Sequence, residues 1–220
     1  MDPVTSGGLL PRARRGAALA LVALGAAGVA AMGFRYRGGD GPGRVDALLD
    51  PALAATSPTA LQVWSFVVVL GSPLVSGALI AVLAIWAAAL RRWSVAALAV
   101  LGPGCAALLA EFAIKPLVGR LSDGDLAFPS GHTVRAVALA TVVILVLLRA
   151  SGPGRWRAAG MVVAGGLSLA VALSLVALQW HYTTDTIGGA LLSVAVVLAV
   201  SLGIDLVGDL VGNLRGAPPG

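Results

Sequence analysis

The stretch Lys115–His132, KPLVGRLSDGDLAFPSGH, is a polar segment inside a chain that is otherwise almost continuously apolar. It contains the only lysine of the sequence and one of its two histidines. The other histidine, His181, lies in a second and shorter polar segment, Trp180–Asp185. Because the chain has few titratable side chains and gathers them in these two segments, we expect both segments to contribute to one functional site.

The composition around these segments is typical of an integral membrane protein. Hydrophobic residues make up 58% of the chain and charged residues only 11%, and the mean hydropathy is +0.94, far above that of soluble domains. The apolar runs are about 18–25 residues long, the length that a helix needs to cross a hydrocarbon core of roughly 30 Å. They lack the alternation of barrel strands. The sequence therefore predicts an all-α fold, a polytopic bundle of six transmembrane helices.

The six predicted spans follow the six apolar runs. They are Gly16–Phe34, Leu74–Leu90, Val95–Ile114, His132–Arg149, Ala158–Trp180 and Thr186–Val207. The first run is long for a signal peptide and lacks a small-residue cleavage site, so we expect it to remain as an anchor.

Two segments between the first and second spans are expected to lie outside the hydrocarbon core. Arg35–Asp50 contains Gly-Gly-Asp-Gly-Pro-Gly and is predicted to be a flexible loop, whose backbone groups would go unpaired in lipid. Ser57 as an N-cap with Pro58 behind it predicts a short helix, Thr59–Leu70. This helix is too short to cross the membrane, and we expect it at the interface or kinked into the second span.

Positive charge near the span ends predicts the orientation. One side of the bundle collects Arg12, Arg14, Arg15, Arg91, Arg92, Arg149, Arg155, Arg157 and Arg215, and the other collects Arg35, Arg37, Arg44, Lys115 and Arg120. The positive-inside rule then places both termini in the cytoplasm and both polar segments on the outer face of the cell membrane. It also explains the high isoelectric point, so no nucleic-acid partner is expected.

The end of the first polar segment has the features of an anion site. Pro129 and Ser130 predict the start of the fourth span, with Ser130 as its N-cap. The free N–H groups and dipole of this helix end favour a phosphate, and Gly131 allows close approach to the backbone. A plain helix cap has the same sequence, but the imidazole of His132 directly behind it favours a functional role.

The second polar segment pairs a histidine with a carboxylate. His181 and Asp185 are spaced i, i+4, so on a helix they share a face, and the carboxylate holds one ring nitrogen while the other stays free to attack. A hydrogen bond at a helix end is the simpler interpretation of this pair alone. With His132 and the anion site, the pair indicates phosphoryl transfer with one histidine as nucleophile and one as acid. Lys115 would neutralise the phosphate.

These residues resemble the type 2 phosphatidic acid phosphatase family of membrane lipid phosphatases. Pro129–His132 matches the second motif of the family in full, and Lys115 matches the lysine that opens its first motif, KxxxxxxRP. Ser174, His181 and Asp185 match the first, eighth and last positions of its third motif, SRxxxxxHxxxD. The resemblance covers roughly Leu74 to Val207.

The resemblance implies hydrolysis of a phosphate ester without a metal or other cofactor. His181 would be phosphorylated, Asp185 would orient it and His132 would act as the general acid. Lys115, Ser130 and Gly131 would hold the phosphate oxygens. The pair Asp123 and Asp125 suggests a cation loop, but two carboxylates alone are more typical of a solvated turn.

The chain departs from the family at two arginine positions. Ser122 and Asp123 stand where the first motif has Arg-Pro, and Leu175 stands where the third motif has Arg. Each charged hydrogen bond of this kind contributes roughly 1.5–3 kcal/mol. We expect Arg120 and Arg135 to compensate by binding the substrate phosphate, and we expect Glu111 to pair with Lys115.

These expectations divide the chain into four parts. Residues 1–15 are a cytoplasmic tail, 16–73 contain the first span with the outer loop and interfacial helix, 74–207 are a phosphatase-like core with five spans, and 208–220 are a second cytoplasmic tail. The expected partners are the bilayer and a lipid phosphate or diphosphate, isoprenoid or glycerolipid.

Two other interpretations of the same residues stay open. An intramembrane hydrolase would use Ser130 as nucleophile with His181 and Asp185 as partners, which leaves Lys115 and the anion site without a role. A lipid-phosphate binding or transport protein would keep the pocket and have lost turnover with the missing arginines.

Overall fold

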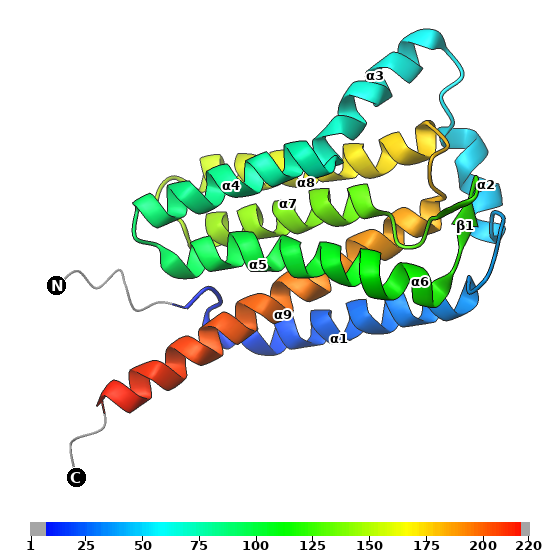
Figure 1. Cartoon of the computed structure of the whole chain (residues 1–220). Coiled ribbons are helices and arrows are strands. Elements are labelled where there is room, and N and C mark those ends of the chain that lie inside the picture. The colour runs from blue at the N-terminus through cyan, green and yellow to red at the C-terminus, as the bar shows by residue number, and fades with distance from the viewer. Residues whose placement is uncertain (1–7, 217–220) are drawn as a thin grey trace.

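The computed structural model describes residues 8–216 as an all-α bundle with one small hairpin (Figure 1). The helices are α1 (Arg12–Arg35), α2 (Arg44–Leu53), α3 (Pro58–Val68), α4 (Pro73–Ala89), α5 (Trp93–Leu109), α6 (Lys115–Val118), α7 (Gly131–Arg149), α8 (Gly154–Ala177) and α9 (Thr183–Gly216). The 3-10 turn η2 (Val69–Gly71) and the π-helical turn η3 (Ala110–Ile114) connect α3 with α4 and α5 with α6. Strands β1 (Leu121–Ser122) and β2 (Asp125–Leu126) pair in antiparallel.

The predicted all-α membrane fold is confirmed. Among the described residues, five helices are long and apolar enough to cross a membrane, and the bent pair α2–α3 raises the number to six. The expected second span corresponds to α4, which has 17 residues and lies in line with the bundle in Figure 1. The predicted tail after residue 207 begins as a helix, because α9 continues to Gly216, while residues 1–7 and 217–220 of the two predicted tails lie outside the described part.

Helix starts follow local capping chemistry. Ser57, Ser72 and Ser130 each precede a helix. The side chain of each serine accepts a hydrogen bond from the backbone N–H three residues later. Prolines occupy the first helical positions of α3 and α4, where the missing N–H has no helical partner. These signals are local in sequence, which explains why the predicted starts of α3 and α7 agree with the structure.

Helix α9 lies at the centre of the bundle and packs against α1, α5 and α7. Glycines allow the close approach of α1: a Cβ on Gly25 would lie 2.9 Å from the Cβ of Ala195. Such small residues let membrane helices pack by van der Waals contact. At one end of this pair, the carboxylate of Asp205 in α9 accepts hydrogen bonds from the backbone of Leu9 and Leu10.

The predicted loop Arg35–Asp50 contains an element that the sequence analysis missed. Its second half is part of α2, whose carboxylate Asp46 is fully buried. The many glycines suggested a flexible loop, but contacts with α9 order the segment. Together with α6, the hairpin and the α8–α9 turn, α2 forms what we call the site end, opposite the two termini in Figure 1.

Candidate active site

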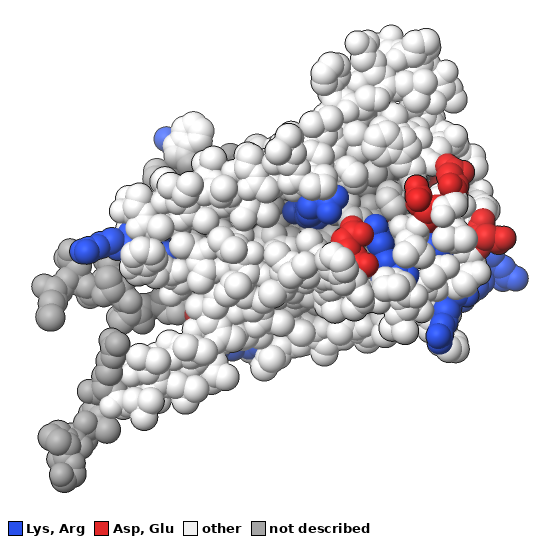
Figure 2. All heavy atoms as spheres, viewed as in Figure 1, with Lys and Arg blue, Asp and Glu red and all other residues white. Residues whose placement is uncertain are grey.

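The two polar segments meet at the site end in one pocket of about 720 Å³. Charged side chains gather toward this end in Figure 2, whereas the rest of the visible face is mostly uncharged. The pocket is lined by Glu111, Lys115, Ser122, Asp123, Gly124, Asp125, Leu126, Ala127, Gly131, His132, Arg135, Trp180 and His181. Both histidines of the chain therefore face a common cavity.

Two cations and one carboxylate form the charged wall of the pocket. The ammonium of Lys115 lies 2.8 Å from Oε2 of Glu111, which confirms the expected pair. On the other side of Glu111, Nη1 of Arg135 lies 3.9 Å from Oε1, and Nε of Arg135 donates to the carbonyl of Gly71. The carboxylate therefore lies between two cations that are suited to bind a phosphate.

This wall is shaped by a change of helical geometry. The π-helical turn η3 contains Glu111 and ends before Lys115, whose N–H bonds to the carbonyl of Ala110, five residues earlier. Pro116 follows directly and has no N–H to donate to the preceding turn. Single π turns are often found at functional sites because they re-aim side chains. Here the turn contains Glu111 and directly precedes Lys115, its partner.

The start of α7 forms the second wall. Ser130 is fully buried, and its hydroxyl accepts hydrogen bonds from the N–H and the hydroxyl of Thr133. Its own N–H donates to the carbonyl of Asp185, which ties α7 to the start of α9. Gly131 packs so closely on Glu111 that any Cβ would overlap the carboxylate. Gly131 and His132, in contrast with Ser130, line the pocket.

The His181–Asp185 pair is built at a helix start. His181 lies in the turn before α9, so the pair does not share a helical face as predicted. Nδ1 of His181 lies 3.7 Å from Oδ2 of Asp185, and this buried nitrogen has no hydrogen-bond partner among the described residues. Oδ2 accepts the N–H of Tyr182. Asp185 therefore caps α9 and faces His181 at once.

Arg120 lies behind this pair and outside the pocket. Its guanidinium is fully buried and lies 2.7 Å from Asp185 and 2.6 Å from Asp46. It also donates to the hydroxyl of Thr184 and is sandwiched between the rings of Tyr36 and Tyr182, 4.2 and 4.4 Å from their centroids. This placement differs from the expectation that Arg120 contacts phosphate. The guanidinium instead binds the carboxylates of Asp185 and Asp46.

Sequence reasoning missed Asp46 and Asp50 of α2. Asp46 accepts from the N–H of Thr184, and Asp50 accepts from the N–H and hydroxyl of Thr183. Both carboxylates thus satisfy free N–H groups at the start of α9. Their i, i+4 spacing was the available signal, because it places two carboxylates on one helical face. The spacing does not show that the partners of these carboxylates are Thr183 and Thr184 at the start of α9.

The hairpin replaces the arginine-bearing part of the first motif. Asp123 and Gly124 have φ values of +51° and +87°, the conformation of a two-residue hairpin turn that favours Asp-Gly. Ser122, the last residue of β1, and Asp123, the first residue of the turn, stand at the Arg-Pro positions and line the pocket. Leu175, at the other arginine position, is fully buried. Within the described residues, no group of three or more His, Cys, Asp or Glu side chains lies close enough to hold a metal.

The part of the chain that carries the site is similar to a known family. A family model described as the PAP2 superfamily matches residues 109–206, which include both histidines, Lys115 and Asp185. This match covers a little under half of the chain. It confirms the resemblance drawn from the sequence, which is to a superfamily of membrane lipid phosphatases.

A solved PAP2 structure shares the fold. It is the crystal structure of a transmembrane PAP2 type phosphatidylglycerolphosphate phosphatase from Bacillus subtilis, 20% identical in sequence. The superposition covers 86% of this chain and 96% of that chain, with a TM-score of 0.67. No curated protein sequence matches the chain.

Proposed function

We propose that the chain hydrolyses a lipid phosphate or diphosphate through a phosphohistidine formed on His181. The observation that carries this proposal is that both histidines, Lys115 and Arg135 line one pocket at the helix ends. The phosphate would lie between the two cations and the first N–H groups of α7, where the helix dipole stabilises negative charge. The carboxylate of Glu111 lies beside this position, between Lys115 and Arg135.

In the proposed reaction, the free ring nitrogen of His181 attacks phosphorus and the ester oxygen leaves. The proton that this oxygen needs comes from His132, the general acid. Water then attacks the phosphohistidine, with His132 accepting its proton, and phosphate departs. Asp185 would orient His181 through Nδ1, and the present separation of 3.7 Å has to shorten only slightly for a hydrogen bond, as is common on substrate binding.

The position of a second cavity supports a lipid as substrate. An apolar cavity of about 460 Å³ lies between α4, α7 and α8. On α7, Ala136, Leu139 and Val143 line this cavity, directly after Arg135 of the pocket. The spacing places all of them on the helical face that starts at His132. A hydrocarbon tail could therefore continue from the phosphate site into the membrane.

Charge placement supports an outward-facing site. The α4–α5 connection contains Arg91 and Arg92, and Arg149 and Arg155 flank the α7–α8 connection. Both connections lie at the end of the termini, and the pocket lies at the other end (Figure 1). By the positive-inside rule, the site end then faces outward.

Phosphate release in detergent tests the proposal. Purified protein is assayed with polyprenyl phosphates, polyprenyl diphosphates and glycerolipid phosphates, including phosphatidylglycerolphosphate, beside His181→Ala and His132→Ala. Both variants should lose at least about 100-fold in turnover, and Cys105→Ser, exposed on α5, should retain it. If the histidine variants release phosphate as fast as the parent, the mechanism is wrong.

Trapping the intermediate separates the proposal from its alternatives. Labelled phosphate should appear on histidine in an acid-labile, base-stable form. A label on Ser130 would favour the serine hydrolase, although the buried hydroxyl of Ser130, bonded to Thr133, argues against it. Tight vanadate binding without hydrolysis of any substrate would favour the binding or transport protein.

A further inference from the structure

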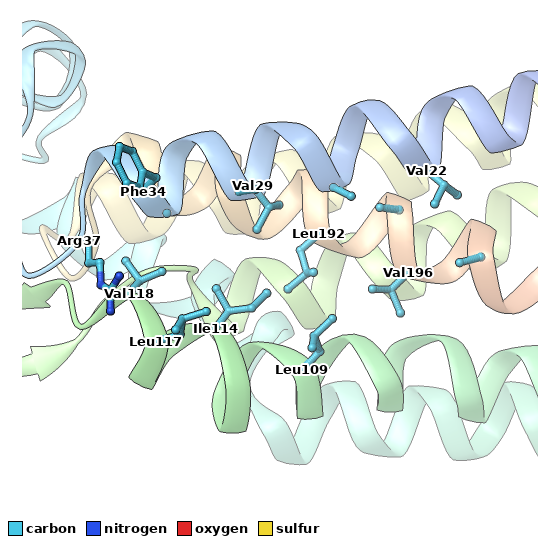
Figure 3. A pocket seen from close by; sticks show the side chains of 15 residues that line it. Val22, Val29, Phe34, Arg37, Leu109, Ile114, Leu117, Val118, Leu192 and Val196 are labelled. Carbon is cyan, nitrogen blue, oxygen red and sulfur yellow. The ribbon is translucent and has the colours of Figure 1, made fainter.

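A third cavity lies on the membrane-facing side of the bundle, away from the reaction pocket. It has a volume of about 500 Å³ and lies between α1, α9 and the α5–α6 segment (Figure 3). We call it the α1–α9 groove. Leu109, Ile114 and Leu117 line it, whereas Glu111 and Lys115 of the same segment line the reaction pocket. The helix that carries both sets therefore separates the two cavities.

The dimensions of the groove fit one acyl chain. On α1 its lining extends from Val22 to Phe34, which is about 18 Å along a helix. Half of a hydrocarbon core of roughly 30 Å is about 15 Å. The floor is hollowed by small side chains, including Ala26, Ala30 and Ala195. The groove thus extends over about one leaflet.

A single cation closes the groove at the site end. Among the described residues that line it, Arg37 alone is charged, and Figure 3 shows its side chain beside Val118, at the opposite end from Val22. Arg37 is solvent-exposed and takes part in none of the ion pairs formed by residues 8–214. Arg37 follows Arg35, the last residue of α1, by two positions. This places it at the end of the span, at the depth of the lipid head groups in the bilayer. An apolar groove with a free cation at this depth complements an anionic lipid.

We propose that the α1–α9 groove binds a glycerophospholipid with a net negative head group, which is not a substrate. One acyl chain lies along α1 and α9, and the phosphate contacts Arg37.

Binding at Arg37 would also support the residues behind the active site. The segment that follows α1 is fixed by hydrogen bonds from Gly38 to Val118 and from Leu121 to Gly39. Its Tyr36 stacks on Arg120. A lipid held at Arg37 would therefore restrain the segment that covers Arg120, and it should raise the thermal midpoint of the protein.

Native mass spectrometry of the delipidated protein tests the site. Phosphatidylglycerol and phosphatidylcholine with the same acyl chains are titrated separately, and phosphatidylglycerol is chosen because it has no phosphate monoester to hydrolyse. The parent should bind phosphatidylglycerol more tightly. Arg37→Ala should weaken this binding about five- to tenfold, the contribution of one arginine to an anionic head group. Arg44→Ala, an exposed arginine outside the groove, should change it little.

Two further variants define where the lipid lies. Ala30→Phe should fill the groove and reduce the adducts of both lipids, and Lys115→Ala should leave phosphatidylglycerol binding unchanged. Loss of binding in Lys115→Ala with none in Arg37→Ala would place the lipid in the reaction pocket and overturn the proposal. Equal binding of the two lipids by the parent would also overturn it. So would a dimeric parent that Ala30→Phe converts to a monomer, because a second copy would then fill the groove.

Discussion

At the scale of single residues, the two arginines expected to replace the family's phosphate clamp have different surroundings. Arg135 lines the pocket, whereas Arg120 is enclosed by Asp46, Asp185 and two tyrosine rings. A buried arginine with two carboxylates cannot be removed without leaving them unpaired. We therefore propose that Arg135 binds the phosphate and that Arg120 positions Asp185.

The two arginines should differ in the kinetic constant that their replacement changes. Arg135→Ala should raise KM by about 10- to 100-fold, because it removes a charged hydrogen bond to the substrate. Arg120→Lys should lower kcat with little change in KM, since a lysine cannot reach both carboxylates and hold Asp185 toward His181. Initial rates over a range of lipid phosphate concentrations measure both. Equal kinetic changes in the two variants would contradict the separate roles.

Glu111 should compete with the substrate for its cations. Its carboxylate lies 2.8 Å from Lys115 and 3.9 Å from Arg135. Glu111→Gln removes the negative charge and should tighten the binding of vanadate or inorganic phosphate several-fold. Asp125→Asn, at the rim of the same pocket, serves as a control for the loss of one negative charge. Weaker anion binding in Glu111→Gln would mean that the carboxylate orients the cations for phosphate.

At the scale of elements, the packing of α1 on α9 depends on a carboxylate near the termini. Asp205 is buried and accepts from the N–H groups of Leu9 and Leu10, 2.5 and 2.8 Å away. Arg15 lies between Asp205 and Asp209. Buried acceptors of this kind matter because their loss leaves backbone donors unpaired.

Asp205→Ala should therefore destabilise the protein. Two unpaired amides cost about 2–6 kcal/mol together, which corresponds to a decrease of roughly 4–24 °C in the thermal midpoint. Asp209→Ala is the matched control, since ion pairs at the surface, such as those of Asp209 with Arg12 and Arg15, contribute little to stability. Thermal unfolding of both variants in the same detergent measures the difference. Equal midpoints would show that the Asp205 contacts contribute nothing measurable.

At the scale of the whole molecule, the two ends of the bundle should face different compartments. Asp40 is exposed at the site end and Ser151 is exposed in the α7–α8 connection. In a Cys105→Ser background, Asp40→Cys should react with an impermeant maleimide in intact cells. Ser151→Cys should react only after the membrane is opened. The reverse pattern would place the site on the cytoplasmic face.

The sequence by itself determined the membrane class, the positions of the helical spans and the two motif segments, because hydropathy and helix capping are local properties. His132, Lys115 and His181 were found in this way, and they line one pocket. The tertiary structure decided which side chains face that pocket. It pairs Arg120 with Asp46, 74 residues earlier. It also places Asp123 in the turn of the hairpin and packs α2 on the start of α9. Such pairings join segments that are distant in the chain, so they follow from packing and from the need of buried charges for partners, which no local pattern encodes.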